Sequence, residues 1–220
     1  MKASMHSDPA PTSPARSTYR HGDLRRALLE AAVELARAGG PDAVVLREAT
    51  RRAGVVPNAA YRHFASRLAL LQAVRAAALS AVARAMEDEL ASVDPAQDPL
   101  AQARASVRAV GTGYLRFAQA ETGLFRTAFA TPVDVDKAPS NAMGGDSGLD
   151  PFELLGAALD RLVEAGGMPP EHRPGAEFLA WSAVHGLALL IIDGPLRGMP
   201  PEQLQALGQR LLDMVEKGLE

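Results

Sequence analysis

The amino-acid sequence predicts an all-α protein. In one segment after another, apolar residues recur every three to four positions, the spacing of one face of a helix. The last three of these segments begin at or near a proline and end near a glycine, as helices tend to do. No segment alternates polar and apolar residues in the manner of a half-buried strand, and we find no internal repeat.

The amino-terminal third predicts an unstructured arm followed by three helices. Residues 1–18 contain three prolines among Ser, Thr and Ala without periodicity, so we expect a disordered arm. A helix from Asp23 ends at Gly39-Gly40-Pro41, and two short helices follow at 46–53 and 57–64. We assign residues 19–65 to this domain.

Residues 66–220 predict a second, larger helical domain. Ser66 is placed to cap a long helix that ends at Asp94-Pro95. Residues 131–150 show no periodic core and predict a polar loop. The helices expected in this domain are, in order, 66–92, 99–119, 122–130, 151–165, 174–192 and 201–219.

The two short helices predict a helix-turn-helix motif, since the turn between them is short and contains Gly54. Pro57 suits the first position of the second helix, where its missing N–H costs nothing. Ala53, Val55, Ala60 and Phe64 can face the core, which leaves Asn58, Ala59, Tyr61, Arg62 and His63 on other faces. The second helix of such a motif lies in the DNA major groove, and Tyr61, His63 and Arg67 could donate to flanking phosphates. Taken alone, Tyr61-Arg-His could also be a plain polar face.

Several fixed spacings in residues 19–75 resemble the DNA-binding domain of the TetR (tetracycline-repressor) family. The matching stretches are Tyr19-Arg-His-Gly-Asp-Leu-Arg, Ala27-Leu-Leu-Glu-Ala-Ala32, Leu46-Arg-Glu, Arg52-Ala-Gly-Val, Tyr61-Arg-His-Phe and Ala69-Leu-Leu71. Trp181-Ser-Ala-Val-His-Gly is similar to the carboxyl domain of one subgroup. The resemblance implies a homodimer that binds a palindromic operator in double-stranded DNA and carries a small-molecule effector pocket.

The resemblance also implies roles for individual residues. Arg47, Pro57, Asn58 and Ala59 match positions that approach bases, whereas Tyr61, His63 and Arg67 match positions that contact phosphates; we include Arg62 in the DNA-binding set. Val45 and Val56 depart from the family pattern, which has Ser or Thr before a helix. A lost capping hydroxyl costs roughly 1 kcal/mol per helix.

Aromatic residues of the second domain predict an effector pocket among the fifth to eighth helices. The candidate lining residues are Tyr114, Phe117, Phe125, Phe129, Phe152, Leu155, Trp181 and His185. Each of these residues taken singly is as readily explained as ordinary core. His185 in particular could be an effector ligand or a catalytic base, but a packed, hydrogen-bonded core histidine is the commoner case.

Charge and composition fit a cytoplasmic protein, which the resemblance to DNA-binding regulators implies would be associated with the nucleoid. Residues 1–67 hold eleven basic and six acidic residues, a net of +5, while residues 68–220 hold twelve and twenty, a net of −8. This asymmetry would turn the amino end toward a polyanion, although a solvated basic face gives the same pattern. Without cysteine the chain has neither disulfides nor thiolate metal sites. The longest apolar run, Leu187–Ile192, is too short to cross a bilayer, so we expect no membrane association.

An enzyme and an architectural DNA binder are the alternatives. The five histidines show no metal-ligand spacing and no serine lies in a nucleophile-elbow pattern, so we expect no catalytic residue, metal or cofactor. An architectural protein would need only about the first third of the chain. The sequence therefore predicts a transcriptional regulator, and the resemblance implies a repressor, which we expect a small apolar or amphipathic effector to release from DNA. We expect its dimer interface on the last two helices, where Leu179, Ala183, Leu187, Leu190 and Ile191 offer apolar surface.

Overall fold

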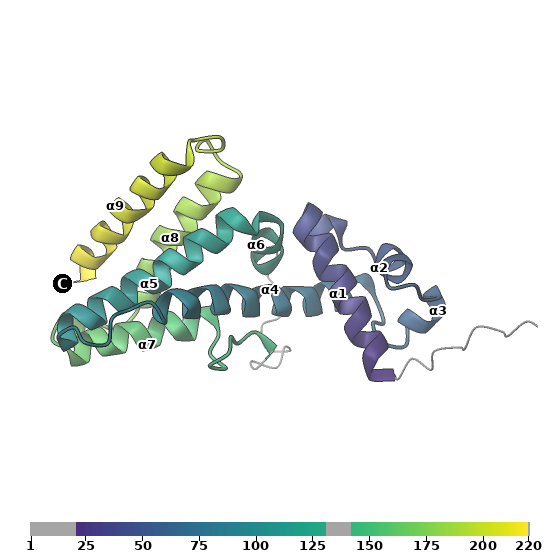
Figure 1. Ribbon diagram of the computed structural model, residues 1–220, viewed down its shortest axis with the longest axis horizontal. Coiled ribbons are helices and arrows are strands. Elements are labelled where there is room, and N and C mark those ends of the chain that lie inside the picture. Colours follow the sequence, from purple (N-terminus) through teal and green to yellow (C-terminus); the bar gives the residue numbers. More distant parts are fainter. Residues whose placement is uncertain (1–20, 131–141, 220) are drawn as a thin grey trace, which may run out of the picture.

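The computed structural model describes residues 21–130 and 142–219, and its regular elements are all helices (Figure 1). The all-α prediction is confirmed. The α-helices in chain order are α1 (His21–Gly39), α2 (Leu46–Arg52), α3 (Pro57–Ala60), α4 (Arg67–Leu90), α5 (Pro99–Ala120), α6 (Thr122–Phe129), α7 (Pro151–Glu164), α8 (Ala176–Ile192) and α9 (Pro201–Leu219). The predicted arm at 1–18 and the first eleven residues of the predicted loop, 131–141, lie outside the described residues.

The first three helices form a small unit at one end of the molecule (Figure 1). Its centre is apolar, because Leu28 and Ala32 of α1, Leu46 of α2, and Ala60 and Phe64 around α3 are all buried. Arg25 of α1 lies over the Phe64 ring, 5.1 Å from its centroid, and so joins α1 to the segment after α3 by a cation–π contact.

The long helix α4 connects this unit to the rest of the protein (Figure 1). Ser66 caps it as predicted, because its Oγ accepts a hydrogen bond from the Ala69 N–H at 3.1 Å. Along its length α4 contacts α1, α5, α6 and α7. Although α4 is long and apolar enough to cross a membrane by composition, these contacts are those of a core helix.

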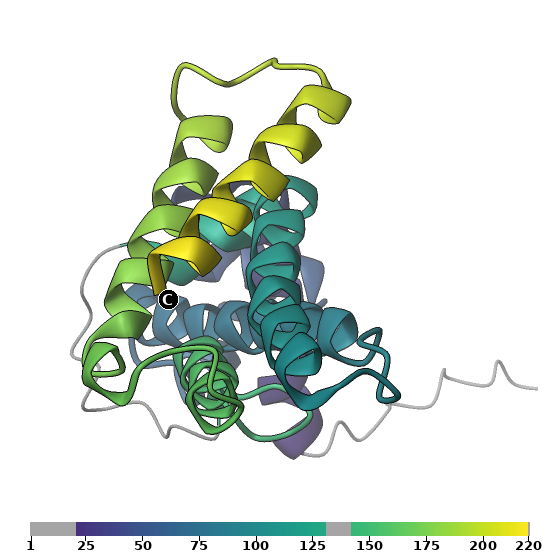
Figure 2. The ribbon, with the colours of Figure 1, turned by 90° about the vertical axis from the view of Figure 1, so that its left-hand side faces the viewer.

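The larger unit is built from α5 to α9, with α8 and α9 paired on one side of α5 (Figure 2). Side chains cap the starts of α5 and α7. Asp98 Oδ1 accepts from two N–H groups of α5, and Asp150 with Glu153 forms a capping box at the start of α7. Arg108 of α5 bonds to Asp213 and Glu216, which fixes α9 against α5.

A second contact, besides α4, joins the two units. Gly123 at the start of α6 packs on the end of α1, where a Cβ would overlap the carbonyl oxygens of Ala36 and Arg37. Beside it, Arg37 Nε donates to Glu121 Oε2 at 2.7 Å. At the other side of α6, Arg126 pairs with Asp193 at the end of α8. The helix α6 is therefore fixed between α1 and α8.

Two predicted helices differ from the structure. The predicted helix 57–64 ends at Ala60, because the Ala60 carbonyl accepts from both the His63 and Phe64 N–H groups and the chain continues as a turn. The predicted start of the eighth helix at Pro174 is two residues early, since Gly175 has a left-handed backbone (φ +80°) and α8 begins at Ala176.

Candidate functional site

The first candidate site is the surface around α2 and α3. Gly54 has the positive φ (+68°) that the turn requires, and the Val55 N–H donates to the Thr50 carbonyl at 3.0 Å. Neither Val45 nor Val56 supplies a side-chain cap, as their apolar side chains predict. The turn is thus held by backbone hydrogen bonds and by the buried side chains of Ala60 and Phe64.

Most side chains of the predicted DNA-binding set are exposed on this surface. Arg47, Asn58, Tyr61, Arg62 and Arg67 are exposed, Tyr61 to 58%, while His63 is half-buried. Pro57 and Ala59 belong to α3, but their side chains lie outside the described part of the structure. The structure brings α2, α3 and the start of α4, which carry these residues, to one end of the molecule (Figure 1).

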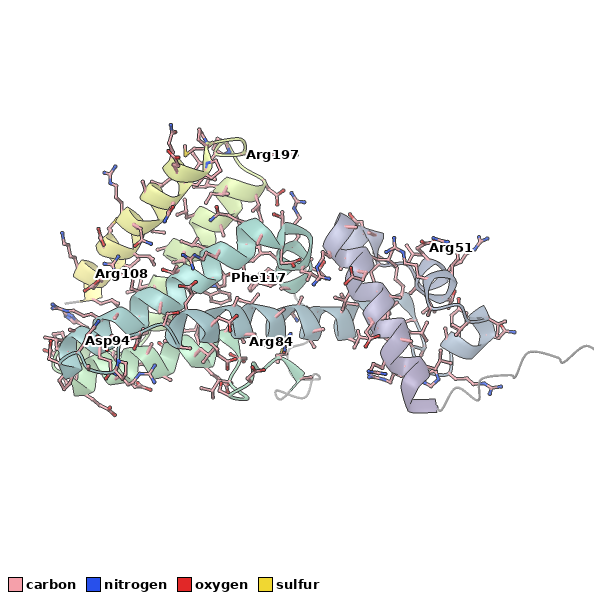
Figure 3. The ribbon with its side chains drawn as sticks, in the orientation of Figure 1. Arg51, Arg84, Asp94, Arg108, Phe117 and Arg197 are labelled. Carbon is pink, nitrogen blue, oxygen red and sulfur yellow. The ribbon has the colours of Figure 1, made fainter. Side chains whose placement is uncertain are left out.

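Two further arginines of α2 are engaged within the helix. Arg51 and Arg52 both pair with Glu48, and the hydrogen bond from Arg51 is the main reason that the pKa of Glu48 falls to about 2. Figure 3 shows Arg51 on the outer side of α2. These arginines therefore contribute less free positive charge than their number suggests.

Arg67 has a structural partner that the sequence did not reveal. Its Nε donates to the Val44 carbonyl and its Nη2 to the Pro41 carbonyl, both at 2.8 Å. These bonds fix the first turn of α4 to the segment that precedes α2. The side chain thus positions the motif, and only its remaining nitrogen is left for a phosphate.

The second candidate site is a cavity of about 240 Å³ in the larger unit. Helices α4, α5, α7, α8 and α9 line it, together with Phe129 of α6 and Met143. Its wall is mostly apolar, as is usual for small-molecule sites. The volume is below the roughly 300–1,000 Å³ of typical ligand pockets, so it suits a small molecule.

Five of the eight predicted lining residues border this cavity, namely Tyr114, Phe129, Phe152, Leu155 and Trp181. Phe117, Phe125 and His185 do not border it. Phe117 is buried and lies between α5 and α4 in Figure 3. Phe125 and His185 lie behind the wall, where their ring centroids are 5.3 Å and 6.2 Å from that of Tyr114.

A short hydrogen-bond chain crosses the aromatic wall. Trp181 Nε1–H donates to Tyr114 Oη at 3.1 Å, and Tyr114 Oη lies 2.7 Å from His185 Nδ1. Burial raises the pKa of Tyr114 above its ordinary value, against the opposing effect of the Trp181 bond, and burial lowers the pKa of His185. The hydroxyl therefore keeps its proton and donates a hydrogen bond to Nδ1 of a neutral imidazole. His185 is packed and hydrogen-bonded behind the cavity wall, as a core histidine commonly is.

The sequence prediction missed the contribution of α4 and α9. Arg75, Leu79 and Met86 of α4 border the cavity, and so do Leu212, Val215 and Glu216 of α9. Arg75 could have been noticed, since it is a lone cation in an apolar stretch of α4. The α9 residues gave no such signal.

A helix-turn-helix unit joined by a long helix to a helical domain with an apolar cavity defines a class of protein, the DNA-binding regulators with a ligand-binding domain. Residues 28–74 match the family model described as bacterial regulatory proteins, tetR family. Residues 107–215 match a model described as the tetracyclin repressor-like C-terminal domain. The chain belongs to the TetR family of transcriptional regulators.

Solved structures support the same fold. A protein of unknown function from Rhodococcus sp. RHA1 is 27% identical with a TM-score of 0.71, covering 93% of this chain and 99% of its own. The TetR family regulator PfmR from Thermus thermophilus is 22% identical with a TM-score of 0.54, covering 88% and 98%. A TetR variant from Acinetobacter baumannii AYE, solved in complex with minocycline, is 20% identical with a TM-score of 0.54, covering 87% and 93%. No curated protein matches the chain.

Proposed function

We propose that this DNA-binding transcriptional regulator is a homodimeric repressor, which a small apolar or amphipathic effector releases from a palindromic operator. The observation that carries the proposal is that one helix, α4, both borders the cavity and begins at the helix-turn-helix motif. In this proposal residues 19–65 bind DNA, residues 66–220 bind the effector and dimerise, and the protein works in the cytoplasm at the nucleoid. A fold relative, the TetR variant from Acinetobacter baumannii, was solved in complex with minocycline, which supports a small-molecule effector for this fold.

The DNA contacts of the proposal follow the exposed surface of the motif. Asn58 is exposed at the start of the second helix, the part of such a helix that meets base edges. Tyr61 and Arg62 are exposed on the turn that follows and serve as phosphate donors with His63. Arg47 of α2 is exposed as well. Arg67 acts mainly by holding α4 against the carbonyls before α2.

The proposed dimer interface lies on α8 and α9 but uses a different set of residues from the predicted one. Leu187 and Ile191 are buried inside the subunit and Ala183 is half-buried, so these three cannot supply the exposed surface. Leu179 and Leu190 are exposed as expected, and three large apolar residues join them, which are Phe178, Leu189 and Met214. Gly186 lies between these α8 residues with open space above it, which allows a second helix to approach closely. A symmetric pair of such faces would bury this apolar surface.

In the proposed switch, the effector changes the distance between the two recognition helices of the dimer. These helices must sit about 34–36 Å apart to enter successive major grooves. A 24-residue helix such as α4 is roughly 36 Å long at 1.5 Å per residue, so a small tilt at the cavity displaces the motif at its far end. The contact of Gly123 with the end of α1 gives the effector a second route to the motif.

Titration of labelled genomic fragments with the purified protein, followed by fluorescence anisotropy, tests the proposal. We expect one or a few fragments to bind far more tightly than competitor DNA. Tyr61→Ala should weaken binding, while Arg84→Gln, an exposed change on α4 away from the motif, should not. If no fragment bound better than competitor DNA, the proposed repressor function would be wrong.

A further inference from the structure

The charged residues in the cavity wall identify the kind of effector that it suits. Four charged side chains border the cavity, which are Arg75, Arg108, Asp150 and Glu216. Arg108, labelled in Figure 3, is neutralised by two carboxylates, since its Nη2 lies 2.6 Å from Asp213 and 2.9 Å from Glu216. Arg108 together with Asp213 and Glu216 therefore leaves no net positive charge for a ligand.

Asp150 is also engaged, in this case with backbone. Its Oδ1 accepts from the N–H groups of Phe152 at 2.8 Å and Glu153 at 2.9 Å, at the first turn of α7. The unbonded N–H groups at the start of a helix stabilise a carboxylate placed there. The negative charge of Asp150 is thus compensated by the helix that it caps.

Arg75 is the remaining charge. It is half-buried, and its Nε donates to the Ala128 carbonyl in the last turn of α6 at 2.9 Å. Among the described residues no carboxylate pairs with it, and neither of its two terminal nitrogens has a hydrogen-bond partner. A cation in an apolar wall is costly unless an anion and hydrogen-bond acceptors meet it.

We propose that the effector is a small amphipathic carboxylate whose carboxyl group pairs with Arg75. Because Nε is bonded to Ala128, the carboxylate binds end-on to Nη1 and Nη2, an arrangement that guanidinium geometry favours. The apolar body lies against Tyr114, Phe129 and Trp181, which favours an aromatic ring. This inference rests on the proposed function, because it names the chemical class of the effector of the same cavity.

The position of Arg75 also gives the carboxylate a part in regulation. Arg75 lies two helical turns after Arg67, about 12 Å along α4, and Arg67 holds the segment before α2. A carboxylate bound to Nη1 and Nη2 fixes the guanidinium, whose Nε stays bonded to Ala128, and so stabilises one arrangement of α4 against α6. Binding of the carboxylate thus acts on α4, the helix that begins at the helix-turn-helix motif.

The test compares three ligands that share one apolar body and differ in charge. Isothermal titration of the full chain with 3-phenylpropionate, 3-phenylpropanamide and 3-phenylpropylamine should show the acid binding roughly tenfold or more tighter than the amide, the usual value of a charge-assisted bond. Arg75→Gln should remove this preference and leave amide binding unchanged. Arg75→Lys should keep part of it. The matched control is Arg84→Gln on the same helix, whose side chain is exposed (Figure 3).

Several outcomes would overturn the inference. They are equal binding of the acid and the amide, tightest binding of the amine, no binding of 3-phenylpropionate, and full acid affinity in a folded Arg75→Gln variant. The comparison within the wild type needs no variant, so a folding defect cannot hide the answer. Operator binding without ligand tests the proposed function separately, and release of DNA by the neutral amide would leave that function standing while the acid class failed.

Discussion

Replacing Tyr114 with phenylalanine tests the hydrogen-bond chain in the cavity wall. The substitution keeps the ring, which meets Phe125 edge-on at 5.3 Å, and removes only the hydroxyl. Trp181 Nε1–H and His185 Nδ1 then both lose their partner. The change therefore isolates the polar contribution of this residue from its packing.

The expected cost follows from the number and the burial of the groups left behind. A buried polar group without a partner costs about 1–3 kcal/mol. Trp181 and His185 are only half-buried, so each lies toward the lower end and the sum should be about 2 kcal/mol. For a chain of this size, that corresponds to a fall in melting temperature of roughly 4–8 °C.

Urea unfolding and thermal melts at one fixed protein concentration would measure this loss. The matched control is Tyr61→Phe, because the Tyr61 hydroxyl has no hydrogen-bond partner among the described residues and is exposed. A double-mutant cycle with His185→Leu should show that the two changes together cost less than their sum. Neutral surface changes alter the free energy of unfolding by up to about 0.5 kcal/mol. If the value for Tyr114→Phe lay within that range of the wild type, the hydrogen bonds from Trp181 through Tyr114 to His185 would not contribute to stability.

Three further predictions concern DNA choice, assembly and pH. Asn58→Ala should reduce the binding free energy by roughly 1–3 kcal/mol at one operator position only, whereas Tyr61→Ala should weaken binding to all sequences. Selection of binding sites from random DNA distinguishes the two effects, and an unchanged sequence profile for Asn58→Ala would contradict base readout. The double substitution Leu179→Glu and Leu190→Glu should convert the dimer into monomers in sedimentation. The control is Leu68→Glu, since Leu68 is also an exposed leucine but lies on α4, and this change should leave the dimer intact. A monomeric wild type at micromolar concentration would contradict the interface. Burial lowers the pKa of His185 below its ordinary 6.5, so the unfolded chain binds the proton more strongly. The contribution of His185 to the free energy of unfolding should be complete above about pH 6.5 and should be lost as the pH falls through the folded pKa. This pH-dependent loss should be absent in His185→Gln, and an unchanged pH profile in that variant would contradict the prediction.

The helices themselves were largely predictable because helical periodicity and caps are local signals. Ser66, Asp94-Pro95 and Gly39-Gly40-Pro41 mark boundaries that the structure reproduces within a few residues. The short α3 was not predictable, because its end depends on how the Ala60 carbonyl is shared between two N–H groups. Residues 61–64 contain neither proline nor glycine, so their composition gave no sign of a helix end.

The cavity was predictable only in part, because periodicity shows which face of a helix is apolar but not which neighbour that face meets. Tyr114 and Phe117 are three residues apart and share a face of α5, yet only Tyr114 borders the cavity. Leu187 and Ile191 likewise belong to an apolar helix in which nothing local separates core from surface. The bonds of Arg67 to Val44 and Pro41 connect residues more than twenty positions apart, and such pairings need the tertiary structure.

The two contacts between the units explain why a small effector could control DNA binding at a distance. The cavity lies beside α4, which continues into the motif, and beside Phe129 of α6, whose other end packs on α1 through Gly123. Arg75 joins these two helices through the Ala128 carbonyl, so a ligand that moves one of them acts on both contacts. The effector can shift the motif only by as much as it prefers one arrangement over the other, typically about 1–3 kcal/mol. Since this coupling is reciprocal, operator DNA must weaken effector binding by the same factor, and a ligand of the cavity that binds equally well with and without DNA has no part in the switch.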